Sequence, residues 1–170
     1  MRTLLASTVL LGVSLSIACG SDSTDPTTAS PFAVASVWAA TRINGAALPY
    51  DWVLSLVDSN GVAVDSFVVR FHAIEFSLGA ALATCQVYQR IEIEGLGQNE
   101  ATDSCNATYE GGILSIEGFG SSGLTVPAGS ELEGVITGAG NAATSFTLQV
   151  PAYQDAGVSQ PALSIVFTRQ

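Results

Sequence analysis

Few side chains in this sequence could do acid–base or nucleophilic chemistry. His72 is the single histidine of the chain, and no motif surrounds it. Carboxylates recur two residues apart at Glu92 and Glu94 and again at Glu131 and Glu133, a spacing that suits acid–base work or a Ca²⁺ site. The same spacing is more typical of a solvated strand face that resists aggregation. We therefore expect no enzyme, no cofactor and no metal site, and a hydrolase built on His72 is the weakest hypothesis.

Two short motifs match ligand-binding loops in spacing only. Residues 118–123 follow G-x-G-x-x-G, which binds a dinucleotide when a helix opens within it, but the Leu-Thr-Val-Pro of residues 124–127 cannot begin a helix. Residues 58–61 look like the middle of a calcium loop, but Leu56 and Phe67 stand where that loop needs carboxylates. We predict a Gly-rich loop at the first motif and a hairpin turn at the second.

The composition excludes further classes of protein. The chain of 170 residues has 5 Lys+Arg, all of them Arg, against 15 Asp+Glu, a formal net charge of −10. Phosphate affinity comes from Lys and Arg, so we expect no nucleic-acid partner. Charged residues make 12% of the chain and hydrophobic residues 48%, which excludes a wholly disordered chain. The length fits one domain.

The first eighteen residues are typical of a secretory signal peptide. Arg2 precedes an apolar or small run from Leu4 to Ile17, which is too short to span a bilayer comfortably. The sequence Ser-Ile-Ala-Cys at residues 16–19 resembles the lipobox of bacterial lipoproteins. That resemblance implies cleavage after residue 18 and lipid on Cys19. Ordinary cleavage at the same place, which would leave Cys19 as a free thiol, is the alternative.

Residues 19–33 are predicted to be a flexible tether. Residues 20–30 contain no large apolar side chain, so they bury too little surface to offset their ordering entropy. Gly20 follows Cys19 where enteric-type sorting would need Asp for inner-membrane retention, so we expect an exported protein anchored to the outer membrane. Without Arg2, four Arg remain against 15 acidic residues, a formal charge of −11. Because anionic lipids repel such a domain, membrane attachment depends on the lipid.

Residues 34–170 show the period-two alternation of strands and no sustained helical period. Gly-containing pairs such as Asn44-Gly45 and Gly111-Gly112 supply hairpin turns between the strands. Many short strands of this kind predict an all-β domain, a single antiparallel β-barrel, with a β-sandwich as the alternative. Strands are predicted at 36–43, 51–57, 62–70, 71–78, 82–94, 104–110, 113–119, 131–137, 144–150 and 162–169.

Two cysteines remain besides Cys19. Cys85 and Cys105 lie at equal distances from Gly95, where we place the apex of a hairpin loop. Antiparallel pairing about that apex sets the two cysteines opposite each other, and an exported protein meets an oxidising compartment. We therefore expect a disulfide, worth about 3 kcal/mol for a loop of about twenty residues; two buried free thiols are the alternative.

The start and end of the domain resemble a small lipocalin-like barrel of bacterial lipoproteins. In lipocalins a G-x-W motif starts the first strand and a late Arg packs over that Trp to close the barrel. The matching positions are Ser36, Trp38 and Arg169, with Ser36 in place of Gly. The opening also resembles the W-x-L-x-x-I-x-G of the META domain, with Ala40 in place of Leu. Independently of either family, an Arg over an indole ring contributes about 0.5–2 kcal/mol.

Two functions fit a lipid-anchored barrel. The barrel could hold a small apolar ligand in its mouth, or it could be a structural or protein-interaction lipoprotein with a filled core. Fold analogy does not separate the two. The residues that we expect to line a ligand site are Phe67, Phe71, Tyr88 and Tyr109.

Overall fold

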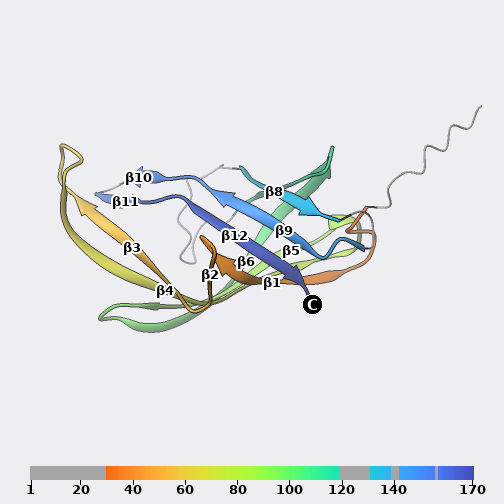
Figure 1. Ribbon diagram of the computed structural model, residues 1–170, viewed down its shortest axis with the longest axis horizontal. Helices are drawn as coiled ribbons and strands as arrows, with labels where there is room; N and C mark the ends of the chain where they lie inside the picture. Colours follow the sequence, from red (N-terminus) through yellow and green to blue (C-terminus); the bar gives the residue numbers. More distant parts are fainter. Residues whose placement is uncertain (1–29, 119–130, 139–141, 156) are drawn as a thin grey trace, which may run out of the picture.

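The computed structural model describes residues 30–118, 131–138, 142–155 and 157–170. The predicted signal peptide, Cys19, the tether up to residue 29 and residues 119–123 of the Gly-rich loop lie outside these ranges. The described residues form twelve strands and one 3₁₀ turn (Figure 1). Their bounds are β1 Ser36–Ile43, β2 Ala46–Ala47, β3 Tyr50–Val57, β4 Ala63–Leu78, η1 Ala80–Leu82, β5 Cys85–Ile93, β6 Gly97–Glu110, β7 Ile113–Glu117, β8 Glu131–Thr137, β9 Ser145–Val150, β10 Tyr153–Asp155, β11 Val158–Gln160 and β12 Leu163–Arg169.

Eight of these strands close into an antiparallel β-barrel, which confirms the predicted fold. The ring runs β4-β5-β6-β7-β8-β9-β12-β1, and β1 closes it by pairing with the second half of β4. The first half of β4 pairs instead with β3, which in turn pairs with β11 and β10. We call the ring the barrel. We call β10, β11 and β3, with residues 63–71 of β4 and the hairpin that joins β5 to β6, the extension.

The chain passes from the extension into the barrel at a bulge in β4. The register against β5 shifts between Phe71 and Ala73, so His72 is the extra residue. Buried side chains alternate with less buried ones up to Phe71. The alternation is then displaced by one residue and continues at Ile74 and Phe76. Our prediction of two strands, 62–70 and 71–78, is therefore wrong. A single strand carries both apolar runs because the bulge absorbs the change of face.

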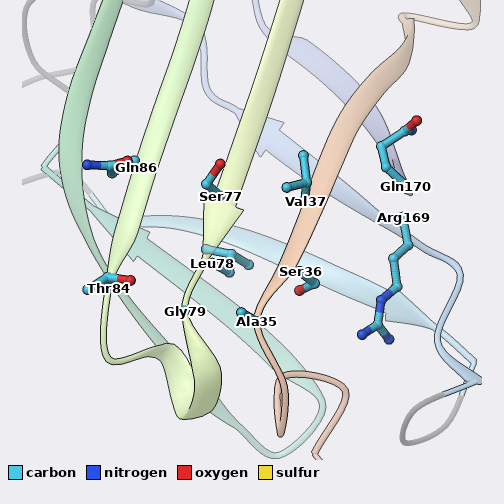
Figure 2. Close-up of a pocket in the computed structure, with 10 residues that line it drawn as sticks. All are labelled: Ala35, Ser36, Val37, Ser77, Leu78, Gly79, Thr84, Gln86, Arg169 and Gln170. Atoms are coloured by element: carbon cyan, nitrogen blue, oxygen red, sulfur yellow. The ribbon is translucent and has the colours of Figure 1, made fainter.

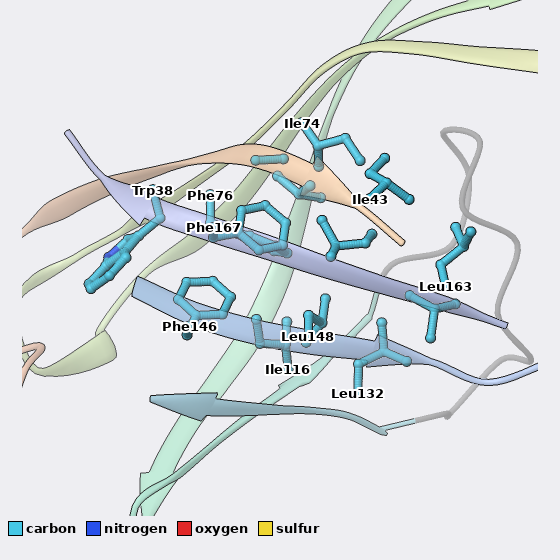
Figure 3. Close-up of a cluster of buried hydrophobic side chains, with 14 of the residues drawn as sticks. Trp38, Ile43, Ile74, Phe76, Ile116, Leu132, Phe146, Leu148, Leu163 and Phe167 are labelled. Atoms are coloured by element: carbon cyan, nitrogen blue, oxygen red, sulfur yellow. The ribbon is translucent and has the colours of Figure 1, made fainter. Parts of the chain in front are cut away.

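Packed aromatic and aliphatic side chains fill the barrel (Figure 3). The ring centroids of Trp38 and Phe146 lie 5.2 Å apart, and Phe146 stacks on Phe167 at 4.8 Å. Phe76 meets Phe167 edge-on at 5.0 Å. All four side chains are fully buried. Each ring stabilises the core through the apolar area that it buries and through its contact with the neighbouring rings.

Three strands and part of a fourth were missed by the sequence analysis. β2, β10 and β11 have only two or three residues each, too few to show a period. β6 begins at Gly97 rather than at residue 104, because residues 98–104 are mostly polar on both faces. Backbone pairing with β5 holds that stretch in a strand without any apolar alternation.

The folded domain begins before residue 34, which corrects the predicted end of the tether. Phe32 is fully buried, and its ring centroid lies 5.8 Å from that of Trp38 and 5.4 Å from that of Tyr109. The amide of Ala81 donates a hydrogen bond of 2.7 Å to the carbonyl of Phe32. We call residues 30–35 the strap, because they cross the end of the barrel outside any strand.

Candidate functional site

The four predicted ligand-lining residues lie in different parts of the domain. Phe71 is fully buried, and its ring centroid lies 5.8 Å from that of Trp52. Phe67 lies on the same strand, half-buried. Tyr109 packs against the strap at the other end of the barrel. Tyr88 points to the outer face of β5, opposite the buried side chains of that strand. The structure therefore distributes these residues over three separate environments.

Trp38 and Arg169 meet where β1 and β12 pair. The two residues are register partners, and the guanidinium carbon of Arg169 lies 5.7 Å from the centroid of the Trp38 ring. The indole Nε1 donates a hydrogen bond of 2.8 Å to the hydroxyl of Ser36. Ser36, which stands where lipocalins have Gly, thus satisfies the polar atom of the buried indole.

The predicted disulfide is confirmed. Cys85 and Cys105 are bonded, are register partners on β5 and β6, and have Cα atoms 4.9 Å apart. Gly95 lies in the connecting turn with a φ of 79°, a conformation that glycine adopts without steric cost. The bridge fastens the first residue of β5 to its neighbour beside η1.

Charged side chains from three strands form a connected row on the outer face of the molecule. Arg70 on β4 binds Asp51 on β3 through two hydrogen bonds, Nε to Oδ1 at 2.6 Å and Nη2 to Oδ2 at 3.0 Å. Nη1 of Arg70 lies 4.0 Å from Oε2 of Glu92 on β5, and Nε2 of His72 lies 3.0 Å from the same oxygen. We call Asp51, Arg70, His72 and Glu92 the charge ladder. Arg70 and His72 are two residues apart on β4, a spacing that places both side chains on the same face of the strand.

The charge ladder changes the ionisation of its members. The hydrogen bond from Arg70, aided by its positive charge, lowers the pKa of the Asp51 carboxyl below the usual aspartate value. The same contact raises the pKa of the Arg70 guanidinium. The two groups therefore stay charged as a bidentate pair, the geometry in which Arg–carboxylate contacts are strongest. Both remain partly exposed, with 44% and 51% of their side chains accessible, which limits what the pair adds to stability.

Tyr88 is the next perturbed group along the same face. Burial raises the pKa of its phenol, and the negative charge of Glu100 on β6 adds to the effect. Glu75 on β4 is the register partner of Tyr88 and raises the pKa further, while Arg90 opposes it. The phenol therefore stays protonated at neutral pH and is a hydrogen-bond donor on this face.

Three shallow grooves lie on the outside of the described structure. One of about 280 Å³ lies over the charge ladder, beside Val68 and Glu94. Another of about 540 Å³ lies between the start of β1, the end of β4 and the start of β5, with Arg169 and Gln170 at its side (Figure 2). A third, of about 590 Å³, lies between the strap, the start of β9 and the same two C-terminal residues. None contains a predicted ligand-lining residue.

The charge ladder contains one histidine–carboxylate pair. His72 and Glu92 form a histidine–carboxylate pair, yet the ladder holds no serine, cysteine or threonine for that pair to activate. Among the described residues no three His, Cys, Asp or Glu side chains are placed to hold a metal ion. Glu131 and Glu133 are exposed on β8. The groups that this face presents are charged and polar side chains.

The sequence analysis missed the charge ladder and the strap. Asp51 and Arg70 stand at similar distances from the turn at residues 58–61, a signal of cross-strand pairing that could have been used. The contact between His72 and Glu92 left no comparable signal, because the bulge displaces His72 from the regular register. For Phe32, a large apolar side chain at the end of a polar segment was the available signal.

Comparisons of this chain with protein-family models, curated proteins and solved structures find no match. In the part of the chain that the structure describes, no helix has the length and apolar character needed to cross a bilayer.

Proposed function

We propose that this protein is an exported, lipid-anchored envelope protein whose barrel is a solid scaffold for contacts made on its outer surface. Cys19, in a sequence that resembles a lipobox, is the expected site of the lipid. The proposal places structural or protein-interaction roles ahead of ligand carriage. One observation carries that order: aromatic rings pack on one another inside the barrel, where Phe146 stacks on Phe167 with ring centroids 4.8 Å apart.

The outer surface offers polar contacts to a partner. The charge ladder joins three strands and lies beside a groove of about 280 Å³. Partly exposed charges of this kind set the specificity and rate of association with a partner of complementary charge. The proposal thus assigns recognition to the extension and rigidity to the barrel.

Cys19→Ser tests the anchor. We expect the unaltered chain to sediment with bacterial membranes and the Cys19→Ser variant to stay in the soluble exported fraction, because the acidic domain has little affinity of its own for anionic lipid. Ser16→Ala, which leaves the cysteine intact, is the control and should remain bound. Membrane attachment of Cys19→Ser would contradict the proposal.

A small apolar ligand is the second candidate function, and one feature favours it. Phe67 is half-buried in the extension and is the register partner of Leu54, two residues from Trp52 on β3. Nε1 of Trp52 is buried without a hydrogen-bond partner among the described residues. A ligand there would meet apolar surface and one donor. Titration with an apolar fluorescent probe distinguishes the two functions: saturable binding that Phe67→Ala weakens favours the carrier, and no saturable binding favours the scaffold.

A further inference from the structure

The two ends of the molecule differ in charge. The grooves of about 540 and 590 Å³ lie on either side of the strap and share Arg169 and Gln170. No side chain that lines them is a carboxylate, although the chain has 15 Asp+Glu. Val34 and Val37 are also exposed there, at 51% and 39%. We call this surface the strap end.

The opposite end carries a concentration of acidic side chains. The hairpins that join β3 to β4 and β5 to β6 project from the far end of the long axis relative to Ser30, where the strap begins (Figure 1). Asp58 and Asp65 are exposed on the first hairpin, and Glu94 is exposed on the second. Hydrogen bonds from the amides of residues 60 and 62 lower the pKa of the Asp58 carboxyl. These groups are negatively charged at neutral pH.

The strap fixes where the chain leaves the domain. Phe32 is held between Trp38 and Tyr109 and is fully buried, so residues preceding Ser30 leave from the strap end. Cys19 lies eleven residues before Ser30. At about 3.5 Å per residue, even a fully extended chain of that length spans no more than about 40 Å. A lipid on Cys19 therefore keeps the strap end near the bilayer.

We propose that the strap end is a docking surface for the lipid bilayer, so that the extension projects away from the membrane. The inference rests on the lipid anchor of the proposed function. Anionic headgroups repel the carboxylates of the two far hairpins. In the grooves of the strap end they meet Arg169, two exposed valines and hydroxyl or amide side chains. Glu110, next to Tyr109, is an exposed carboxylate near the strap. The charge ladder, on the extension, then faces the surroundings instead of the bilayer.

Energy transfer to the membrane tests this orientation. The variants Val34→Cys and Val62→Cys, each in the full chain processed and lipidated by a bacterial host, give a matched pair because the replaced valines are 51% and 59% exposed. With Cys85 and Cys105 bonded and Cys19 acylated, the new thiol is the one that a fluorescent donor labels. The proteins are placed on vesicles of zwitterionic and anionic phospholipid that contain an acceptor-labelled lipid.

We expect transfer from position 34 to exceed transfer from position 62 by at least about twofold, with a larger ratio on vesicles richer in anionic lipid. Equal transfer, or stronger transfer from position 62, would overturn the orientation while leaving the anchor intact. Adding Cys19→Ser to each variant should abolish transfer from both positions. Transfer that survives Cys19→Ser would instead overturn the anchor, so the two failures are distinguishable.

Discussion

The barrel and the extension share two long strands but differ in what holds them together. In the barrel, buried rings from β1, β4, β9 and β12 pack on one another. In the extension, Trp52 and Phe71 form the aromatic contact, and the charge ladder ties β3, β4 and β5 together on the outer face. The extension also ends in short strands, since β10 and β11 have three residues each.

The proposed function assigns rigidity to one part of this sheet and recognition to the other. A closed barrel leaves no free strand edge and excludes water from its core. An open sheet with half-exposed charges has a lower local stability and offers groups to a partner. The bulge at His72 joins the two, because it changes which residues of β4 face inward, from Val69 and Phe71 before it to Ile74 and Phe76 after it.

The largest expected effect is a loss of stability when a phenylalanine is replaced by alanine, a substitution that we compare between the two regions. Phe167→Ala removes a fully buried ring from the barrel and should lower the free energy of unfolding by about 3–5 kcal/mol. Phe67→Ala removes a half-buried ring from the extension and should cost about 1–2 kcal/mol, since less area returns to water. Urea unfolding measures both. Equal losses would contradict the division between the regions.

Loss of the disulfide should have the second-largest effect on the free energy of unfolding. Replacing both Cys85 and Cys105 by Ala removes a bridge with a sequence separation of 20 and should cost about 3 kcal/mol through a less restricted unfolded chain. Wild-type protein unfolded in the presence of a thiol reductant is the control and should show the same midpoint. An unchanged midpoint in both would show that the bridge does not stabilise the barrel.

Removal of the cation–π contact should have a smaller effect. Arg169→Met keeps the aliphatic stem over Trp38 but loses the guanidinium, so we expect a loss of about 0.5–2 kcal/mol. Arg42→Met is the matched control, because Arg42 is exposed on the paired strand and donates to the carbonyl of Gly45 at 3.2 Å. The control should change stability by less than about 0.5 kcal/mol. Similar losses of stability in Arg169→Met and Arg42→Met would show that the contact between Arg169 and Trp38 does not stabilise the fold.

The smallest effect is a pH dependence confined to the charge ladder. The pKa of Asp51 is lower in the folded state. The contribution of Asp51 to the free energy of unfolding is therefore present above the usual aspartate pKa and is lost as the pH falls through the pKa of the folded state. Asp51→Asn should therefore lose less stability than wild type between neutral and acidic pH. In an NMR titration, Arg70→Gln should raise the pKa of Asp51 toward its usual value. An unchanged titration would remove Arg70 as the cause.

The barrel was more predictable than the extension for a physical reason. Alternation along 131–137 or 163–169 reports burial on one face directly, and the symmetry of Cys85 and Cys105 about Gly95 gave their pairing. The bulge at His72 interrupts the alternation, so one strand looked like two. Phe32 was assigned to the tether because its burial depends on Trp38 and Tyr109, which lie beyond the reach of a local pattern.

Native mass spectrometry of the processed chain, released gently from bacterial membranes, tests the central claim that the protein is a scaffold and not a ligand carrier. We expect the mass of the chain from Cys19 to Gln170, with lipid on Cys19 and the Cys85–Cys105 bridge, and no further mass that denaturation removes. A discrete additional mass that is lost on denaturation, and that Phe67→Ala diminishes, would contradict the claim and identify a carrier.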